Sequence, residues 1–134
     1  MTVTATVRPA PKSREERTFD LDIVAAVAAT TTFGIGMAKG TFAVKRLEVI
    51  SPSDYAADPA NYYTIDVRPH GGSAALSWST QSTADGALSA NVVAEKDGPV
   101  GPLAAGQLDV VCTKAAAAAN LPAQTRVRVT IVLL

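Results

Sequence analysis

Apolar and polar side chains alternate in two segments near the middle of the chain, residues 41–50 and 62–68. In the second segment Tyr63, Ile65 and Val67 share one parity, and the residues between them are polar. Successive side chains of a strand point to opposite faces, so this spacing predicts a β-strand with one buried and one solvated face.

The first of these segments has the same alternation with a slip in its middle. Phe42 and Val44 share one parity, whereas Leu47 and Val49 share the other. One extra residue near Lys45, a β-bulge, would return both apolar pairs to the same face.

Shorter alternating patterns run through the rest of the chain. They predict further strands over residues 19–33, 74–80, 88–92, 107–113 and 125–134. Within the first, the alanine-rich residues 24–29 fit either a strand or a helix, and the threonines that follow favour a strand. The last pattern is the most regular and ends at the final residue, which indicates a strand deep within a sheet.

Residues that favour turns separate these segments. The predicted turns and breaks are Gly34 and Gly36, residues 39–40, the loop 51–61, the turns 69–72 and 81–86, and a break at 97–102. Residues 114–120 could form one or two helical turns, too few to be stable alone. Seven or eight short strands without a long helical period predict an all-β fold, a two-sheet antiparallel β-sandwich of jelly-roll type over residues 18–134.

The residues before this domain, 1–17, predict an extended N-terminal arm. Pro9 and Pro11 interrupt any strand pairing, and residues 12–17 are a mixed run of charges. Four basic and two acidic side chains give the arm a charge of about +2 at standard ionisation. The arm could be a disordered terminus or could order on a neighbouring subunit.

Composition narrows the class of protein. The 134 residues are enough for one domain with a sizeable core. Twelve basic residues balance twelve acidic ones, which argues against a nucleic-acid binder and favours association with itself or with other proteins. The single cysteine, Cys112, cannot form an internal disulfide.

No signal peptide or membrane span is expected. Residues 1–7 lack a basic start and a continuous apolar block. The most apolar uncharged stretch, residues 23–38, has 16 residues, fewer than the about 20 that a membrane-spanning helix needs. A strand–turn–strand fits it better, so we expect a soluble protein.

Residues able to carry chemistry are few. His70 and Cys112 lie 42 positions apart without metal-ligand spacing, and we interpret them as an exposed turn histidine and a core residue. Asp20 and Asp22 share a strand face, where they could bind a cation or act as a carboxylate pair, although a solvated face is the commoner outcome. We therefore expect no catalytic site, metal or cofactor.

Four aromatic residues could form a platform for sugars, namely Tyr55, Tyr62, Tyr63 and Trp78. Trp78 shares parity with Leu76, which favours a place in the core. Among the strand aromatics, only Tyr62 is predicted to point outward.

The order of segments from Thr41 to the C-terminus resembles that of a known class of proteins. It runs from Asn61-Tyr62-Tyr63-Thr64-Ile65 through a small-residue strand, Ala74–Thr80, to Leu103-Ala104-Ala105-Gly106-Gln107-Leu108-Asp109-Val110, and closes with residues 119–129. In this order and style the chain resembles the capsid decoration, or cement, proteins of tailed bacteriophages, which have β-sandwich or jelly-roll folds.

The resemblance implies a non-enzymatic virion protein that is assembled in the host cytoplasm and docks on the capsid exterior. It would bridge subunits of the major capsid protein, stabilise the shell against internal DNA pressure, and form a homodimer or homotrimer. On this reading the arm and the loop 51–61 contact the shell, and the candidate partner-binding residues are Arg8, Lys12, Arg14, Arg17, Asp54, Tyr55 and Tyr62. Two alternatives remain: a carbohydrate-binding or adhesive module of a phage tail or fibre, and a small enzyme built around Asp20 and Asp22 or around His70 and Cys112.

Overall fold

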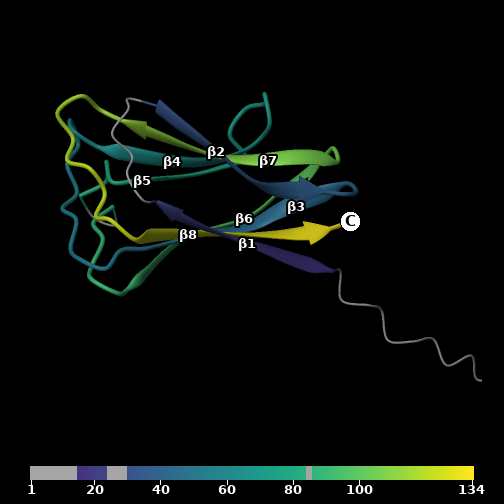
Figure 1. Cartoon of the computed structure of the whole chain (residues 1–134), viewed down its shortest axis with the longest axis horizontal. Coiled ribbons are helices and arrows are strands. Elements are labelled where there is room, and N and C mark those ends of the chain that lie inside the picture. The colour runs from purple at the N-terminus through teal and green to yellow at the C-terminus, as the bar shows by residue number, and fades with distance from the viewer. Residues whose placement is uncertain (1–14, 24–29, 84–85) are drawn as a thin grey trace, which may run out of the picture.

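The computed structural model describes residues 15–23, 30–83 and 86–134, which form eight β-strands (Figure 1). The strands are β1 (Glu16–Ile23), β2 (Thr30–Ala38), β3 (Phe42–Ile50), β4 (Tyr63–Pro69), β5 (Leu76–Ser79), β6 (Val93–Leu103), β7 (Gly106–Lys114) and β8 (Thr125–Leu133). No helix long and apolar enough to cross a membrane occurs in these three ranges.

The strands form two four-stranded sheets with the orders β1-β8-β3-β6 and β2-β7-β4-β5. Every paired strand is antiparallel to its neighbour. All connections pass from one sheet to the other except the one between β4 and β5, which are neighbours in the same sheet. Eight strands wound in this way form a jelly roll, so the predicted all-β sandwich is confirmed.

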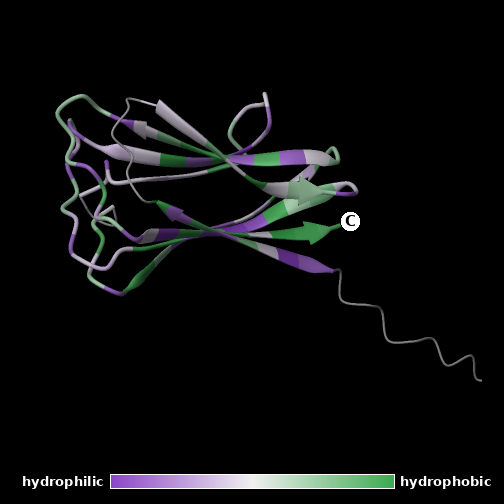
Figure 2. Ribbon diagram, in the orientation of Figure 1, coloured by the Kyte–Doolittle hydropathy of each residue, from purple (hydrophilic) through white to green (hydrophobic). Residues whose placement is uncertain are grey.

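The two sheets form two layers (Figure 1). The core lies between them and consists of the inward-facing side chains of both. Figure 2 shows hydrophobic residues recurring along the strands of both layers. Tyr63, Ile65 and Val67 of β4 are fully buried, as their shared parity predicts. Strand β8 lies between β1 and β3, in the interior of its sheet, which confirms the position inferred from its regular alternation.

The predicted bulge in β3 is present. The register of β3 shifts between Val44 and Arg46 against both neighbours, β6 and β8. Against β8, Lys45 is the extra residue, whereas against β6 the extra residue belongs to β6. Phe42, Val44, Leu47 and Val49 all face the core.

The predicted turn at Gly34 and Gly36 is wrong, because both glycines lie inside β2. The register with β7 shifts between them, so the irregularity is a bulge within the strand. A Cβ at Gly36 would lie 2.4 Å from Cε1 of Phe19, so glycine here leaves room for the ring contributed by β1. Close approach of another chain segment is a common reason for glycine within a strand.

The predicted strand at 88–92 and the break at 97–102 are also wrong. Leu88 makes only an isolated bridge with Tyr55, and β6 begins at Val93 and continues through Pro99 and Pro102. Strand β6 is at the edge of its sheet, where a residue without an N–H group is tolerated. In the alanine-rich segment 114–120, Lys114 ends β7 and residues 115–118 form a turn rather than helical turns.

The first strand begins earlier than predicted. Glu16 and Arg17 belong to β1, opposite Val132 and Ile131 of β8, so the predicted arm is too long at its C-terminal end. Residues 1–14 and the ambiguous segment 24–29 lie outside the described residues.

Candidate interaction surfaces

The candidate basic residues fall in two groups. Arg8, Lys12 and Arg14 lie outside the described residues. Arg17, predicted in the arm, lies instead in β1, where its exposed guanidinium forms an ion pair with Glu15 at 2.6 Å. Arg17 thus keeps its exposure but belongs to the folded body.

Tyr55 is not available to a partner, so this candidate is corrected. Its side chain is buried, and its hydroxyl donates a hydrogen bond of 2.6 Å to the carbonyl oxygen of Ala119. Its backbone pairs in both directions with Leu88. Tyr55 therefore ties the 51–61 loop to the loops before β6 and before β8.

The other two loop candidates remain at the surface. Asp54 is exposed, and its Oδ1 accepts a hydrogen bond of 2.8 Å from the backbone N–H of Ala90. Tyr62 is half-buried, and its carbonyl oxygen accepts a hydrogen bond from the N–H of Ala115. The loops before β4, β6 and β8 gather at one end of the sandwich (left in Figure 1).

The predicted aromatic platform is not assembled. Trp78 is 6% exposed and lies in the core, as its parity with Leu76 predicts. Tyr63 is fully buried and Tyr55 is 8% exposed. Tyr62 alone of the four keeps a partly exposed ring, which removes the cooperative stacking surface that sugar recognition would use.

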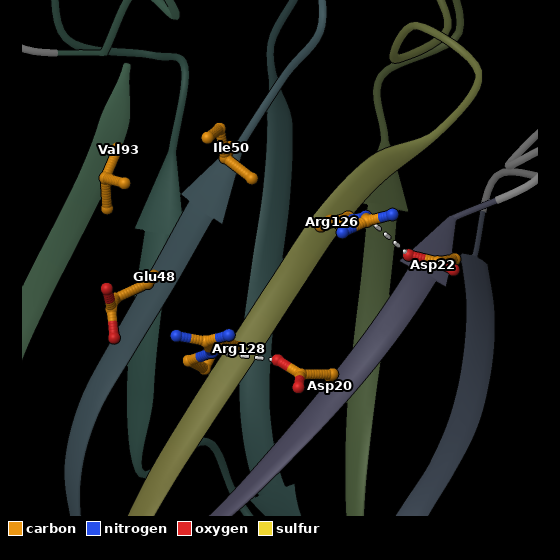
Figure 3. A pocket seen from close by; sticks show the side chains of 7 residues that line it. All are labelled: Asp20, Asp22, Glu48, Ile50, Val93, Arg126 and Arg128. Atoms are coloured by element: carbon orange, nitrogen blue, oxygen red, sulfur yellow. Dashed lines mark hydrogen bonds and ion pairs between the residues drawn. The ribbon is translucent and has the colours of Figure 1, made fainter. Parts of the chain in front are cut away.

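The carboxylate pair on β1 is paired with arginines of β8. Asp20 and Asp22 both lie on the exposed face of the strand, as predicted. Oδ1 of Asp20 lies 2.8 Å from Nε of Arg128, and Oδ1 of Asp22 lies 3.2 Å from Nε of Arg126 (Figure 3). Exposed ion pairs of this kind contribute little to the stability of a fold, because solvent screens the two charges.

These ion pairs form one side of a shallow depression of about 410 Å³ on the outer face of the β1-β8-β3-β6 sheet. We call it the charged hollow, and it is lined by Asp20, Asp22, Glu48, Ile50, Val93, Arg126 and Arg128 (Figure 3). Strand pairing places Arg126 opposite Ile50 and Arg128 opposite Glu48. In Figure 3, Arg128 lies between Asp20 and Glu48.

Sequence inspection identified only the two aspartates of this surface. Arg126 and Arg128 are visible as outward residues of the last strand, but their partners come from β1 and β3, more than 70 positions away in the chain. Only the register between strands could have connected them.

The opposite sheet carries two carboxylates that are unusually buried for its outer face. Asp66 accepts hydrogen bonds from Arg68 Nη2 at 2.7 Å and from Ser77 Oγ at 2.5 Å. It was predicted to be solvated, but these neighbours cover it. Asp109 is likewise buried, 2.7 Å from Nδ1 of His70 and 2.9 Å from Nε2 of Gln107.

The structure separates His70 from Cys112. His70 is exposed in the predicted turn and contacts Asp109 on the outer side of β7, whereas Cys112 is buried on the inner side. The two residues therefore do not form a nucleophile–base pair. No group of three or more histidine, cysteine, aspartate or glutamate residues is placed to hold a metal ion in the part of the chain that the structure describes.

Cys112 leads to a prediction about stability at alkaline pH. Burial raises the pKa of its thiol from 9.0 to about 11, and hydrogen bonding with Tyr63 only partly opposes this. The folded state then holds the proton more tightly, so the stability from this group is complete below about pH 9 and is lost as the pH rises toward 11. We expect the free energy of unfolding to fall by up to about 1.4 kcal/mol per pH unit more in the natural protein than in Cys112→Ala.

Urea unfolding of both proteins between about pH 8 and pH 10 measures this difference. The pKa of Tyr63 is raised partly by Cys112, so the two proteins are best compared below about pH 10, where Tyr63 keeps its proton in both the folded and the unfolded states. If the free energy of unfolding fell with pH equally in the natural protein and in Cys112→Ala, the thiol could not be buried at this position.

Comparison with known proteins adds likenesses in fold only. No protein-family model matches the chain, and no curated protein matches it. Among solved structures, the chain is similar to the capsid asymmetric unit of cyanophage Pam1, with a TM-score of 0.49, 15% identity, and coverage of 99% of this chain and 98% of that one. It is also similar to a structure of infectious bursal disease virus, Gx strain, with a TM-score of 0.34, 15% identity, and coverage of 88% of this chain and 32% of that one. Both are viral structures, and at these TM-scores the likeness by itself assigns neither a family nor a function.

Proposed function

We propose that the protein is a non-enzymatic structural component of a virion that binds the outside of a capsid and bridges major capsid subunits. The observation that carries this proposal is the sheet order β1-β8-β3-β6 and β2-β7-β4-β5, the jelly roll. This fold is used by viral capsid domains, lectins and cupin enzymes, so fold analogy leaves three classes to be separated by their surfaces.

The surfaces favour the structural class. The ionisable groups that could have formed a reaction centre are held by neighbours in separate places: Asp20 and Asp22 by arginines of β8, and His70 by Asp109. A lectin would need aromatic rings at its surface, whereas Trp78 and Tyr63 are in the core. The exterior is polar and nearly neutral. Protein interfaces as a whole are about as polar as ordinary protein surface, so such an exterior is compatible with binding another protein.

Such a protein would stabilise a shell through buried area. A standard interface removes about 1,600 Å² from water, and repetition over a shell lets contacts of modest affinity act together. To bridge capsid subunits without covalent bonds, a protein needs a rigid domain and segments that extend to neighbouring subunits. The sandwich is the rigid domain. The proposed contacts are residues 1–14 and the loop 51–61, with Asp54 and Tyr62.

Co-sedimentation with shells assembled from the major capsid protein of the same source tests this proposal. We expect the full chain to sediment with the shells and a variant lacking residues 1–14 to lose most of that binding. The deletion must stop there, because Glu16 and Arg17 pair with β8 and their loss would damage the fold. Met37→Ala is the control: this methionine is 69% exposed in β2, outside both proposed contacts, and its truncation should leave shell binding unchanged.

Two results would contradict the proposal. One is that the full chain does not sediment with the shells. The other is that the truncated variant, with thermal unfolding unchanged, occupies the shells as fully as the natural protein, which would exclude the arm as a contact.

One depression could serve as a sugar site under the carbohydrate-binding alternative. A depression of about 450 Å³ between the edges of β5 and β6 is lined by Trp78 together with polar residues that include Gln81 and Lys96. Glycan binding by the full chain that is lost in Gln81→Ala would favour this alternative over capsid binding.

A further inference from the structure

The half of the charged hollow formed by β3 and β6, taken together with Arg46, Glu95 and Asp97 just outside its lining, combines acidic and apolar side chains. Strand pairing places Glu48 opposite Glu95 and Ile50 opposite Val93. Val93 is 48% exposed, which is unusual for a valine in a strand. Two like charges lie directly across from each other here, an arrangement that destabilises a sheet unless a cation comes between them.

Cations of the same chain do not fully balance this half. Arg46 pairs with Asp97 at 2.7 Å and lies 3.5 Å from Glu95, so one guanidinium serves two carboxylates. Glu48 makes no hydrogen bond or close ion pair with any residue that the structure describes, and the guanidinium groups of Arg46 and Arg128, which already pair with other carboxylates, act on it only at longer range. With standard ionisation, Glu48, Glu95 and Asp97 against Arg46 leave a net charge of about −2.

The other half of the hollow is already neutral. Asp20 and Asp22 are balanced by Arg128 and Arg126, each through the Nε of the arginine. The unbalanced charge is therefore concentrated at Glu48 and Glu95, beside the apolar pair of Ile50 and Val93. A ligand that fits must bring positive charge and apolar side chains together.

Residues 1–14 of this chain have that composition. They contain Arg8, Lys12 and Arg14 and no acidic residue, which gives about +3 from side chains. Val3, Ala5 and Val7 alternate with threonines, so an extended segment would present its apolar residues on one side. We propose that residues 1–14 of one copy bind the β3–β6 half of the charged hollow on a second copy, with cations beside Glu48 and Glu95 and apolar side chains over Ile50 and Val93.

A second copy is favoured over the same chain by the position of the arm. Residues 1–14 join the body at Glu15, whose carbonyl oxygen accepts a hydrogen bond from the N–H of Leu133. The hollow is at the other end of β1, near Asp22, so the arm would have to reverse direction to reach the hollow of its own chain. Pro9 and Pro11 fix φ and favour an extended backbone, which leaves only residues 12–14 for a reversal next to the body.

The contact is electrostatic and exposed, so it weakens with salt. Salt shortens the range over which exposed charges interact, from about 30 Å at 0.01 M to about 3 Å at 1 M. Reversing one charge replaces an attraction by a repulsion, and for exposed charges this weakens association by about tenfold.

Sedimentation velocity of the full chain over a range of concentrations tests the proposal. We expect association at low salt that is lost at high salt. Glu48→Lys, and separately the triple variant Arg8→Glu, Lys12→Glu, Arg14→Glu, should each weaken self-association by about tenfold or more. Asp54→Lys, a reversal of an exposed acid outside this face, is the matched control and should associate like the natural protein.

The decisive measurement mixes the triple variant with the double variant Glu48→Lys, Glu95→Lys, whose β3–β6 side carries about +2. The acidic arm of the triple variant should bind this basic surface, so the mixture should associate more tightly than either protein alone. The proposal is overturned if the natural protein stays monomeric at low salt, if Glu48→Lys associates normally, or if the mixture stays monomeric. Thermal unfolding of each variant confirms that the body is folded. This contact needs no shell, so its failure leaves capsid binding to be judged by co-sedimentation.

Discussion

Replacing Phe42 with alanine is expected to lower the free energy of unfolding by about 3–5 kcal/mol. Phe42 is 1% exposed and lies in β3 between Leu103 of β6 and Leu133 of β8. Removal of the ring takes away buried apolar contacts and leaves a cavity that the surrounding strands can fill only in part. The total free energy of unfolding of a 134-residue domain is about 7–20 kcal/mol, so this one substitution removes a large share of it.

Urea unfolding followed by the fluorescence of Trp78, the single tryptophan, measures the loss. Val92→Ala is the control: this valine is 57% exposed, and its truncation should change the free energy of unfolding by no more than about 0.5 kcal/mol. A loss below about 1 kcal/mol for Phe42→Ala would mean that the ring is not in the packed core.

Replacing Gly98 with alanine is expected to destabilise the fold by about 1–3 kcal/mol, with a larger loss if the strands cannot separate. A Cβ at this position would lie 2.3 Å from the carbonyl oxygen of Val44 and 2.8 Å from the backbone nitrogen of Val100. Both obstacles are backbone atoms, so no side-chain rotation relieves the contact.

The reason lies in a bulge of β6 opposite Lys45. Between the pairs Val44–Val100 and Arg46–Asp97, two residues of β6 oppose the single residue Lys45, and the backbones approach closely there. Gly40→Ala is the matched control, because no atom lies within 4 Å of the added Cβ, and we expect its stability to be unchanged or slightly higher. Equal denaturation midpoints for the two glycine variants would show that β3 and β6 are not paired in this register.

The two stability predictions concern the body, whereas both functional proposals concern its exterior. The core variants should therefore lower thermal stability without changing self-association below the unfolding temperature. Conversely, substitution of Glu48 should change self-association and substitution of Asp54 should change shell binding, each with little effect on unfolding. This separation makes loss of binding distinguishable from loss of fold.

Much of the architecture could be predicted from the chain itself. The period-two spacing of Tyr63, Ile65 and Val67, and the change of parity between Val44 and Leu47, identified a strand and a bulge that the structure contains. These are local signals, because alternation places side chains on faces regardless of which strand pairs with which. Local signals failed for β6, where glycines and prolines indicated a break although an edge position tolerates them.

The candidate surface depended on contacts between distant residues. Nothing near Tyr55 indicates that its hydroxyl meets Ala119, and nothing near Arg128 indicates that it lies between Asp20 and Glu48. Alternation along the chain thus determined the strands, the buried faces and the sandwich. The pairing register, which depends on the packing of all eight strands together, decided which charges meet and which acid is left without a partner among the described residues.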